Sequence, residues 1–450
     1  MASSNSSSSK GTSRRDFIRN SSLLVAGGAM AAGSLNIARA AHSFGSDEIK
    51  IGLVGCGGRG SEAANQAMNT SGGPVKLVAM ADAFEDRLQA SYRSLKSNKN
   101  EKVDVPKERM FSGFDGYKDL LKCDLDLVIL ATPLGFRPLH FEAAIAAGKH
   151  VFMEKPVATD PAGVRRVLNS VKISKEKNLA VQVGLQRHHE RKYMATVKAI
   201  QDGAVGDIVL ARAYWNGQTP WVRPRQENMT ELEYQMRNWY YFNWLCGDHI
   251  VEQHIHNLDV INWIKNAYPK TAQGVGGCEV RKGREYGETF DHHMVEFTYP
   301  DGTVLLSECR HQPNCWNSVS EYVHGTKGRS DVSGSKIYDS SGKMTHNFGD
   351  LGADGWQQEH HDFFADLRAG RIPNEGEYGA LSTMTAIFGR MATYSGNKLD
   401  WDKCLNYAVP LANFDAFKSL KDEAPVKPGP DGFYKLPVPG QGDWWQELKA

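Results

Sequence analysis

The sequence lacks three features that would place it in a specialised class of protein. No apolar run reaches the length of a membrane span. Lys and Arg number 53 against 52 Asp and Glu, a net charge of +1. That balance excludes the basic footprint of a nucleic-acid-binding protein and a polybasic membrane surface. The seven cysteines are odd in number and show no C-x-x-C spacing, which excludes a disulfide framework and a thiolate zinc site. The 450 residues suffice for two domains or three small ones.

The N-terminal residues are predicted to be a targeting signal and not part of the fold. Residues 13–19 are Ser-Arg-Arg-Asp-Phe-Ile-Arg, which resembles a twin-arginine export signal. A Gly/Ala-rich segment, residues 23–35, and a small-x-small site at residues 38–40 follow. We therefore expect residues 1–40 to be a signal peptide and the mature protein to be periplasmic, without membrane insertion. The alternative is a tail with two chance arginines.

Residues 50–82 predict the element around which the chain is organised. An apolar run at 51–54 leads into Gly55-Cys56-Gly57-Gly58-Arg59-Gly60, and a second apolar run ends at Asp82. Strand, G-x-G-x-x-G, helix, strand and terminal acid form the fingerprint of a dinucleotide-binding Rossmann domain. Asp82 is placed to bind the adenosine ribose and would repel a 2′-phosphate, so NAD is expected in preference to NADP. The alternative is a glycine-rich loop in another α/β protein.

Further strands and helices alternate up to about residue 187. Apolar runs at 125–130, 150–153 and 180–184 are separated by helical segments, which predicts a doubly wound parallel sheet. The carboxyl ends of such strands line the edge where open α/β sheets bind ligands. We thus predict a Rossmann domain at 48–187. Its expected cofactor-binding residues are Gly55, Gly57, Gly58, Arg59, Gly60, Asp82, Thr132, Pro133, Glu154 and Lys155.

The remainder, 188–450, predicts a second α/β domain with an open, mainly antiparallel sheet. A long strand at 208–215 and an aromatic, arginine-rich excursion at 216–246 precede a helix expected at 248–265. Strand-like runs with turns between them then follow at 274–282, 291–299, 303–311 and 317–324. Helices are expected near 356–370 and 378–396, and the Pro/Gly-rich tail at 407–450 is expected to wrap the surface. We expect a homo-oligomer formed through this sheet.

Lys155 is the first residue to which chemistry can be assigned. It stands at the carboxyl end of a buried strand, before Pro156, and would point into the cofactor crevice. Partial burial there lowers a lysine pKa toward the range of a general base. Taken alone, the residue fits a surface lysine at a strand end better than a catalytic base.

The combined motifs resemble the glucose–fructose oxidoreductase, inositol dehydrogenase and rhizopine-catabolism (Gfo/Idh/MocA) family. They are the glycine fingerprint, Ala131-Thr132-Pro133, Glu154-Lys155-Pro156 and the second domain with its open sheet; the resemblance runs from Ile49 to about Lys398. It implies an NAD(P)-dependent oxidoreductase that acts on a sugar, glycoside or cyclitol. It also implies that Lys155 binds the reacting hydroxyl and takes part in its proton transfer.

A second catalytic group follows from the same resemblance. The family has a helix with the pattern Asp-x-Gly-x-His followed by Asp, and here the stretch reads Glu252-Gln253-His254-Ile255-His256-Asn257-Leu258-Asp259. His256 falls on the family's histidine, while Glu252 and His254 replace its usual Asp and Gly. On a continuous helix Glu252 and His256 are i,i+4, so the carboxylate could orient the imidazole.

A metal site is the alternative for this helix. His249, Glu252 and His256 at i, i+3, i+7 have a spacing that could hold zinc. Hydride transfer in this family needs no metal, and none is expected here. The histidine pairs at 188–189, 292–293 and 360–361 are interpreted as solvated or core residues.

The aromatic excursion indicates a carbohydrate substrate. Trp faces stack on sugar rings, while Arg and Asn hydrogen-bond hydroxyls. The expected substrate residues are Trp221, Arg223, Arg237, Asn238, Trp239 and Asp259. Apart from Asp259, these residues fit a packing loop equally well.

Three functions stay open on the sequence. The first is reversible oxidation of a carbohydrate hydroxyl by an enzyme that keeps its nucleotide tightly bound. The second is a glycosidase that uses NAD transiently, by oxidation, elimination, addition of water and reduction. The third is a nucleotide-holding protein without turnover, against which Lys155 and His256 both argue.

Overall fold

In the computed structural model, residues 48–352 and 354–450 are described, and the expected signal peptide at 1–40 lies outside them. In the described part, one sheet has six parallel strands in the order β3-β2-β1-β4-β5-β6. The strands are β1 (Ile49–Val54), β2 (Val75–Asp82), β3 (Met110–Ser112), β4 (Leu127–Leu130), β5 (His150–Met153) and β6 (Val181–Val183). The predicted Rossmann sheet is confirmed.

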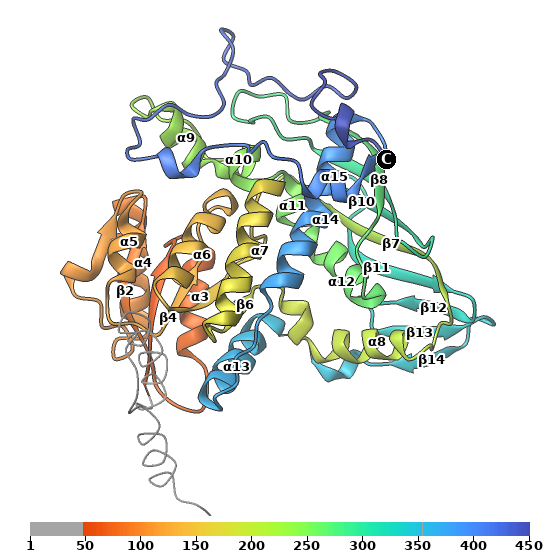
Figure 1. Cartoon of the computed structure of the whole chain (residues 1–450), viewed down its shortest axis with the longest axis horizontal. Helices are drawn as coiled ribbons and strands as arrows, with labels where there is room; N and C mark the ends of the chain where they lie inside the picture. The colour runs from red at the N-terminus through yellow and green to blue at the C-terminus, as the bar shows by residue number, and fades with distance from the viewer. Residues whose placement is uncertain (1–47, 353) are drawn as a thin grey trace, which may run out of the picture.

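Helices cover both faces of this sheet (Figure 1). One face packs on α3 (Gly58–Met68) and α4 (Glu85–Asn98), and the other on α5 (Gly116–Leu121), α6 (Arg137–Ala146) and α7 (Pro161–Glu176). Both faces are buried, which is why the strands are continuous apolar runs.

The first face has a further cover that comes from far along the chain. Helix α13 (Gly355–Arg368) packs beside α3 and places Phe363, Phe364 and Leu367 in the same apolar cluster as Ile51 and Phe152. The Rossmann core therefore includes a segment outside the predicted range 48–187.

The second sheet is mixed and mostly antiparallel, as predicted. In the described residues it has nine strands in the order β14-β13-β12-β11-β7-β10-β9-β8-β15, with one parallel pair, β7 and β10. Their bounds are β7 (Ile208–Gly217), β8 (Thr271–Gly277), β9 (His292–Thr298), β10 (Val304–His311), β11 (Ser318–Gly325), β12 (Gly328–Asp331), β13 (Lys336–Asp339), β14 (Met344–Asn347) and β15 (Leu399–Asp400).

The inner face of this sheet packs on helices, chiefly α12 (Ile255–Lys265) and α14 (Gly376–Ser395), while α8 (Arg191–Gln201) packs on α12. The β-strands also carry exposed apolar side chains, among them Val275, Met294 and Val319. None of the helices in the described ranges is both long enough and apolar enough to cross a membrane.

The helix predicted at 248–265 is interrupted, and this corrects the sequence interpretation. It forms α11 (His249–Glu252) and α12, separated at Gln253 and His254. His254 turns inward, where its Nε2 lies 2.8 Å from Ser307 Oγ on β10. Glu252 and His256 therefore do not share a continuous helical face.

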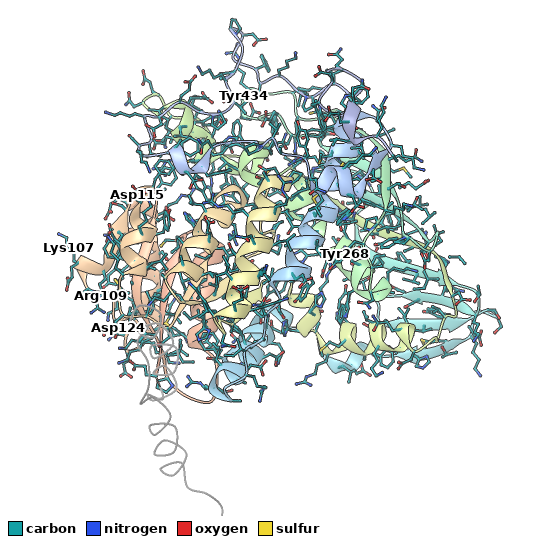
Figure 2. The ribbon with its side chains drawn as sticks, in the orientation of Figure 1. Lys107, Arg109, Asp115, Asp124, Tyr268 and Tyr434 are labelled. Carbon is teal, nitrogen blue, oxygen red and sulfur yellow. The ribbon has the colours of Figure 1, made fainter. Side chains whose placement is uncertain are left out.

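The excursion at 216–246 forms α9 (Glu231–Arg237) and α10 (Asn243–Cys246), and the tail crosses over both (Figure 1). The first part of the tail binds the Rossmann domain: Leu411 N donates to Asp160 Oδ2 at 2.9 Å, and Arg166 Nη1 donates to Asp415 Oδ2 at 2.8 Å. A later part binds the excursion, where Tyr434 (Figure 2) accepts from Arg225 Nη2 at 2.9 Å. The tail is a strap over both domains.

Candidate functional site

A cavity of about 560 Å³ lies between the carboxyl edge of the Rossmann sheet and the second domain. All ten residues predicted to bind the cofactor line it. They come from the ends of β1, β2, β4 and β5 and from the loop that opens α3, as the topology of a doubly wound sheet requires.

The glycines fit a dinucleotide for two separate reasons. Gly55 has φ +96°, and a Cβ there would lie 2.6 Å from the backbone of Ala131, so the turn after β1 requires glycine. A Cβ on Gly60 would lie 1.9 Å from Gly55 O, so the close packing of α3 on β1 requires the second glycine. A Cβ on Gly58 meets nothing within 4 Å, and one on Gly57 meets only Arg87 Nη1 at 3.9 Å. Those two glycines instead leave open the space that a pyrophosphate needs at the N-terminus of α3.

Asp82 stands at the end of β2 with its carboxylate fixed by the backbone. Oδ2 accepts from Cys56 N at 2.7 Å and Oδ1 accepts from Phe84 N at 2.8 Å. Burial raises its pKa, which these hydrogen bonds and Arg87 oppose. The remaining lone pairs can accept ribose hydroxyls.

The same end of the cavity is aromatic, which the sequence did not indicate. Phe84, Phe114, Tyr117, Phe136 and His140 line it. Burial lowers the pKa of His140 to about 3, so its imidazole is neutral and adds to an uncharged wall. Such a wall suits an adenine ring. In a sequence these residues cannot be distinguished from ordinary core positions.

Arg59 and Glu154 form an ion pair on the cavity wall. Arg59 Nε donates to Glu154 Oε1 at 2.6 Å, and Arg59 Nη1 donates to Gln66 Oε1 at 2.9 Å. The fully buried Glu359 of α13 lies behind them, 3.7 Å from Arg59 Nη2. Burial and the Glu154 charge raise the pKa of Glu359 well above its usual value. The side chain of Arg59 is thus fixed by Glu154, Gln66 and Glu359.

Lys155 meets the second domain at Glu252. Its Nζ donates to the backbone carbonyl of Glu252 and lies 3.1 Å from Glu252 Oε1, and both side chains are about one-seventh exposed. The expected contact between Glu252 and the His256 imidazole is replaced by this ion pair, because the chain breaks between α11 and α12. Glu252 orients the lysine.

His256 also lines the cavity, with its ring stacked on Trp215 at a centroid distance of 5.9 Å. Burial, and then the Lys155 cation, lower its pKa well below the usual value. Its Nδ1 is buried without a hydrogen-bond partner among the described residues. His256 is therefore a neutral imidazole beside Lys155.

The residues predicted to bind substrate separate into two groups. Trp221, Arg223 and Trp239 line the cavity. Arg237 does not: it pairs with Asp86 through two hydrogen bonds of 3.1 Å.

Asn238 and Asp259 also lie away from the cavity lining. Asn238 is fully buried, and its Oδ1 accepts from Arg223 N at 2.8 Å. Asp259 Oδ1 accepts from Ser382 Oγ at 2.7 Å, and its Oδ2 lies 2.8 Å from His188 Nε2. Asn238 and Asp259 shape the walls behind the cavity.

The possible zinc set at His249, Glu252 and His256 does not converge. His249 instead joins Asp248 and His293, the one group in the described ranges whose atoms lie close enough for a metal. The Asp248 carboxylate there already accepts from Tyr394 Oη at 2.7 Å, from Phe290 N at 2.8 Å and from both N and Nδ1 of His249, at 2.5 Å and 2.8 Å. These hydrogen bonds occupy the lone pairs of the carboxylate, so Asp248 serves as a buried hydrogen-bond acceptor and not as a metal ligand.

Further lining residues were missed, among them Gln186, Trp215, Gln253 and Trp356. Gln253 was within the quoted family stretch, next to Glu252, and could have been found there. Trp356 opens α13, and no sequence signal relates that helix to the cavity.

Two family descriptions match the chain. Residues 49–185 match the oxidoreductase family with an NAD-binding Rossmann fold, and residues 193–330 match the GFO/IDH/MocA C-terminal domain. Together these ranges cover more than half of the chain and contain all the catalytic residues that were predicted.

Curated relatives match more distantly. Inositol 2-dehydrogenase of Klebsiella pneumoniae is 27% identical over 264 residues, 57% of this chain and 66% of that protein, just under two thirds of its length. The 2,7-anhydro-N-acetylneuraminate hydratase of Escherichia coli is 28% identical over 207 residues, 45% of this chain and 50% of that protein.

Among solved structures, scyllo-inositol dehydrogenase from Lactobacillus casei, with bound NAD(H) and scyllo-inositol, has a TM-score of 0.58. The identity is 20%, and the alignment covers 79% of this chain and 99% of that one. The likeness shows a shared fold.

Proposed function

Because the chain belongs to the Gfo/Idh/MocA family of oxidoreductases, with its NAD-binding Rossmann fold, we propose that it oxidises and reduces a hydroxyl of a sugar, glycoside or cyclitol. The observation that carries this proposal is the convergence of Lys155, Glu252 and His256 in one cavity with the glycine loop. The substrates named for the relatives, inositols among them, support the class of substrate.

The proposed mechanism divides the work between cofactor and side chains. A nicotinamide cofactor held in this cavity would supply the acceptor for the hydride of the carbinol carbon. Lys155 is held in place by Glu252 from the other domain and binds the reacting hydroxyl; its amine takes the hydroxyl proton after passing one of its own protons to the Glu252 carboxylate 3.1 Å away. The neutral imidazole of His256 can accept a proton at one nitrogen and release one at the other. Trp215 keeps that ring in one orientation.

The nucleotide of this enzyme is proposed to be resident. The second domain adds Trp221, Arg223 and Met236 to the cavity lining, so release requires more than an opening of the Rossmann loop. Phe414 of the strap packs behind the aromatic wall, with its ring centroid 4.9 Å from that of Phe136. Export of the folded protein by the twin-arginine route would deliver it to a compartment without free NAD, where only a retained nucleotide is useful.

A sugar panel tests the activity directly. Wild-type protein is mixed with sugars, glycosides and cyclitols, and the absorbance of reduced nicotinamide at 340 nm is followed with and without added NAD. At least one compound should reduce the nucleotide. If none does, with NAD demonstrably bound, the oxidoreductase proposal is wrong.

NAD is proposed over NADP because the fixed carboxylate of Asp82 would repel a 2′-phosphate. Arg87 also lines the cavity, and its positive charge would favour the 2′-phosphate of NADP. Titration of nucleotide-free protein should give tighter binding of NAD(H); tighter NADP(H) binding would contradict the role given to Asp82.

A glycosidase or hydratase without net redox change is the second candidate. The relative named as a hydratase favours it, since addition of water needs no external electron acceptor. Release of free aglycone from a synthetic glycoside without added cofactor separates it from a dehydrogenase.

Two proposals concern the whole protein. Fractionation of cells should place the wild type, and not an Arg14→Lys/Arg15→Lys variant, in the periplasm.

The homo-oligomer is proposed to form through the open sheet, where Met294 and Val319 are exposed. Replacement of both residues by aspartate should lower the mass of the particle measured by light scattering.

A further inference from the structure

Gln253 occupies the break between α11 and α12 and lines the cavity between Glu252 and His256. Its Oε1 lies 2.7 Å from Nε2 of His311 on β10, which is itself only 1% exposed. The orientation of an amide beside a histidine is decided by the other partners of that histidine.

Arg281 decides the tautomer of His311. Its buried guanidinium donates from Nη2 to His311 Nδ1 at 2.7 Å. An arginine has only donors, so Nδ1 must accept. Burial, and then the His249 and Arg281 neighbours, hold the pKa of His311 well below its usual value. The neutral ring therefore carries its one proton on Nε2.

That proton fixes the Gln253 amide. His311 Nε2–H can only donate to an oxygen, so Oε1 faces the protein, and a flipped amide would set two donors against each other. The NH₂ group is left on the cavity side. Within the described ranges nothing accepts from this nitrogen, so it is available to a ligand.

We propose that Gln253 is a specificity-determining residue that donates from Nε2 to an acceptor oxygen of the substrate close to the reacting carbon. His311 and Arg281 are positioning residues that keep the donor pointing into the cavity. The inference rests on the proposed function of the same site. It names the class of group the substrate must carry: a hydroxyl or carbonyl oxygen, which a methylene or an ammonium group cannot replace.

The tautomer is tested first, without any substrate. Protein labelled with ¹⁵N at histidine is examined by long-range ¹⁵N–¹H correlation, with His311 assigned from the His311→Gln variant. A proton on Nε2 and a bare Nδ1 between pH 6 and 8 support the assignment. A proton on Nδ1, or an imidazolium, would overturn it.

The ligand contact is tested by binding. Calorimetry compares D-glucose, scyllo-inositol and the 2-, 3-, 4- and 6-deoxyglucoses on wild type, Gln253→Met and the half-buried control Gln89→Met of α4, whose amide bonds to Glu85. In the wild type and control, one deoxy analogue should bind at least about 10-fold more weakly than glucose, since the fixed donor is left unpaired. In Gln253→Met that penalty should fall to about 2-fold or less. Equal ratios in all three proteins, or no ligand bound at all, would overturn the proposal.

The positioning role has its own control. His311→Gln retains one donor and one acceptor and should keep most of the discrimination, whereas His311→Phe should lose it. The amount of bound NAD and the melting temperature should not rank wild type, His311→Gln and His311→Phe in the order of their ligand discrimination. If the wild type binds these sugars selectively but its nicotinamide stays oxidised, the proposed oxidoreductase function is wrong. The role of Gln253 in binding would still hold.

Discussion

At the scale of single residues, the chemistry depends on an ion pair that joins the two domains. Lys155 comes from the end of β5 and Glu252 from α11, and the Lys155 amine contacts both the backbone carbonyl and the carboxylate of Glu252. Burial, and then the Lys155 cation, hold the pKa of His256 well below its usual value and keep its imidazole neutral.

Replacement of Lys155 separates chemistry from cofactor binding. Lys155→Ala should lose hydride transfer by a factor on the order of 10² to 10⁴, the range for one proton-transfer group. Bound nucleotide should remain, because the lysine contacts Glu252 and not the glycine loop. Stopped-flow absorbance at 340 nm measures the first quantity and nucleotide assay of denatured protein the second. The exposed Lys175→Ala of α7 is the control, and near-normal turnover of Lys155→Ala would refute the mechanism.

His256 gives a second residue-scale prediction. His256→Ala should lower kcat by a factor on the order of 10² to 10⁴. Since the pKa of His256 is well below its usual value, its titration should produce no step in the rate between pH 6 and 8. A kinetic pKa near 6.5 that disappears in the variant would contradict the neutral imidazole.

At the scale of elements, the strap ties the Rossmann domain to the excursion. It contacts the N-terminus of α7 through Asp160, α7 again through Arg166, and α9 through Thr230. Opening the adenosine end requires some of these contacts to break.

Weakening the strap should therefore speed nucleotide release. Phe414→Ala removes the ring that packs on Phe136, and Asp415→Asn removes the ion pair with Arg166. The double variant should lose bound NAD at least about 10-fold faster, a loss of roughly 1.4 kcal/mol of barrier. Release is followed by dilution into a scavenging dehydrogenase. The control is Phe433→Ala, which changes an exposed residue elsewhere in the tail. Equal release rates in all three proteins would show that the strap does not retain the nucleotide.

The elements also show what the sequence predicted and what it could not. Strand periodicity, the glycine fingerprint and Glu154-Lys155-Pro156 are local signals, and the sheet edge that they predicted is present. The break at Gln253 was invisible because residues 249–265 contain neither Gly nor Pro. It depends on His254 reaching Ser307, more than 50 positions away. The cover provided by α13 and the aromatic adenosine wall likewise depend on distant packing.

At the scale of the whole molecule, buried histidines couple stability to pH. Burial lowers the pKa of His140 and His254 to about 3 and that of His150 to about 4. Each is neutral when folded and takes up a proton near pH 6.5 when unfolded, so its contribution is present above that pH and is lost as pH falls. His189 has the opposite sign, since Asp362 and Glu375 outweigh burial and raise its pKa to about 10.

Stability to urea should therefore fall between pH 7 and pH 5. Each of the three histidines contributes about 1.4 kcal/mol per pH unit below its unfolded pKa. The His189 contribution is already complete below that pH, whereas the buried carboxyl of Glu288, whose pKa is raised to about 7, works in the opposite direction and offsets part of the fall. His150 accepts from Ala180 N at 2.9 Å, so His150→Asn can keep that bond and should flatten the slope. The exposed His346→Asn is the control. An unfolding midpoint that rises on acidification would contradict the prediction.

The central claim is that this protein is an oxidoreductase with a resident nucleotide. The most direct measurement uses the mature protein, purified without added cofactor and mixed with the sugar panel while absorbance at 340 nm is recorded. The protein is then denatured, and total NAD(H) is assayed in the supernatant. The account predicts close to one nucleotide per chain and a sugar-dependent change of up to one equivalent without added NAD. An empty protein that needs added NAD for every turnover would contradict it.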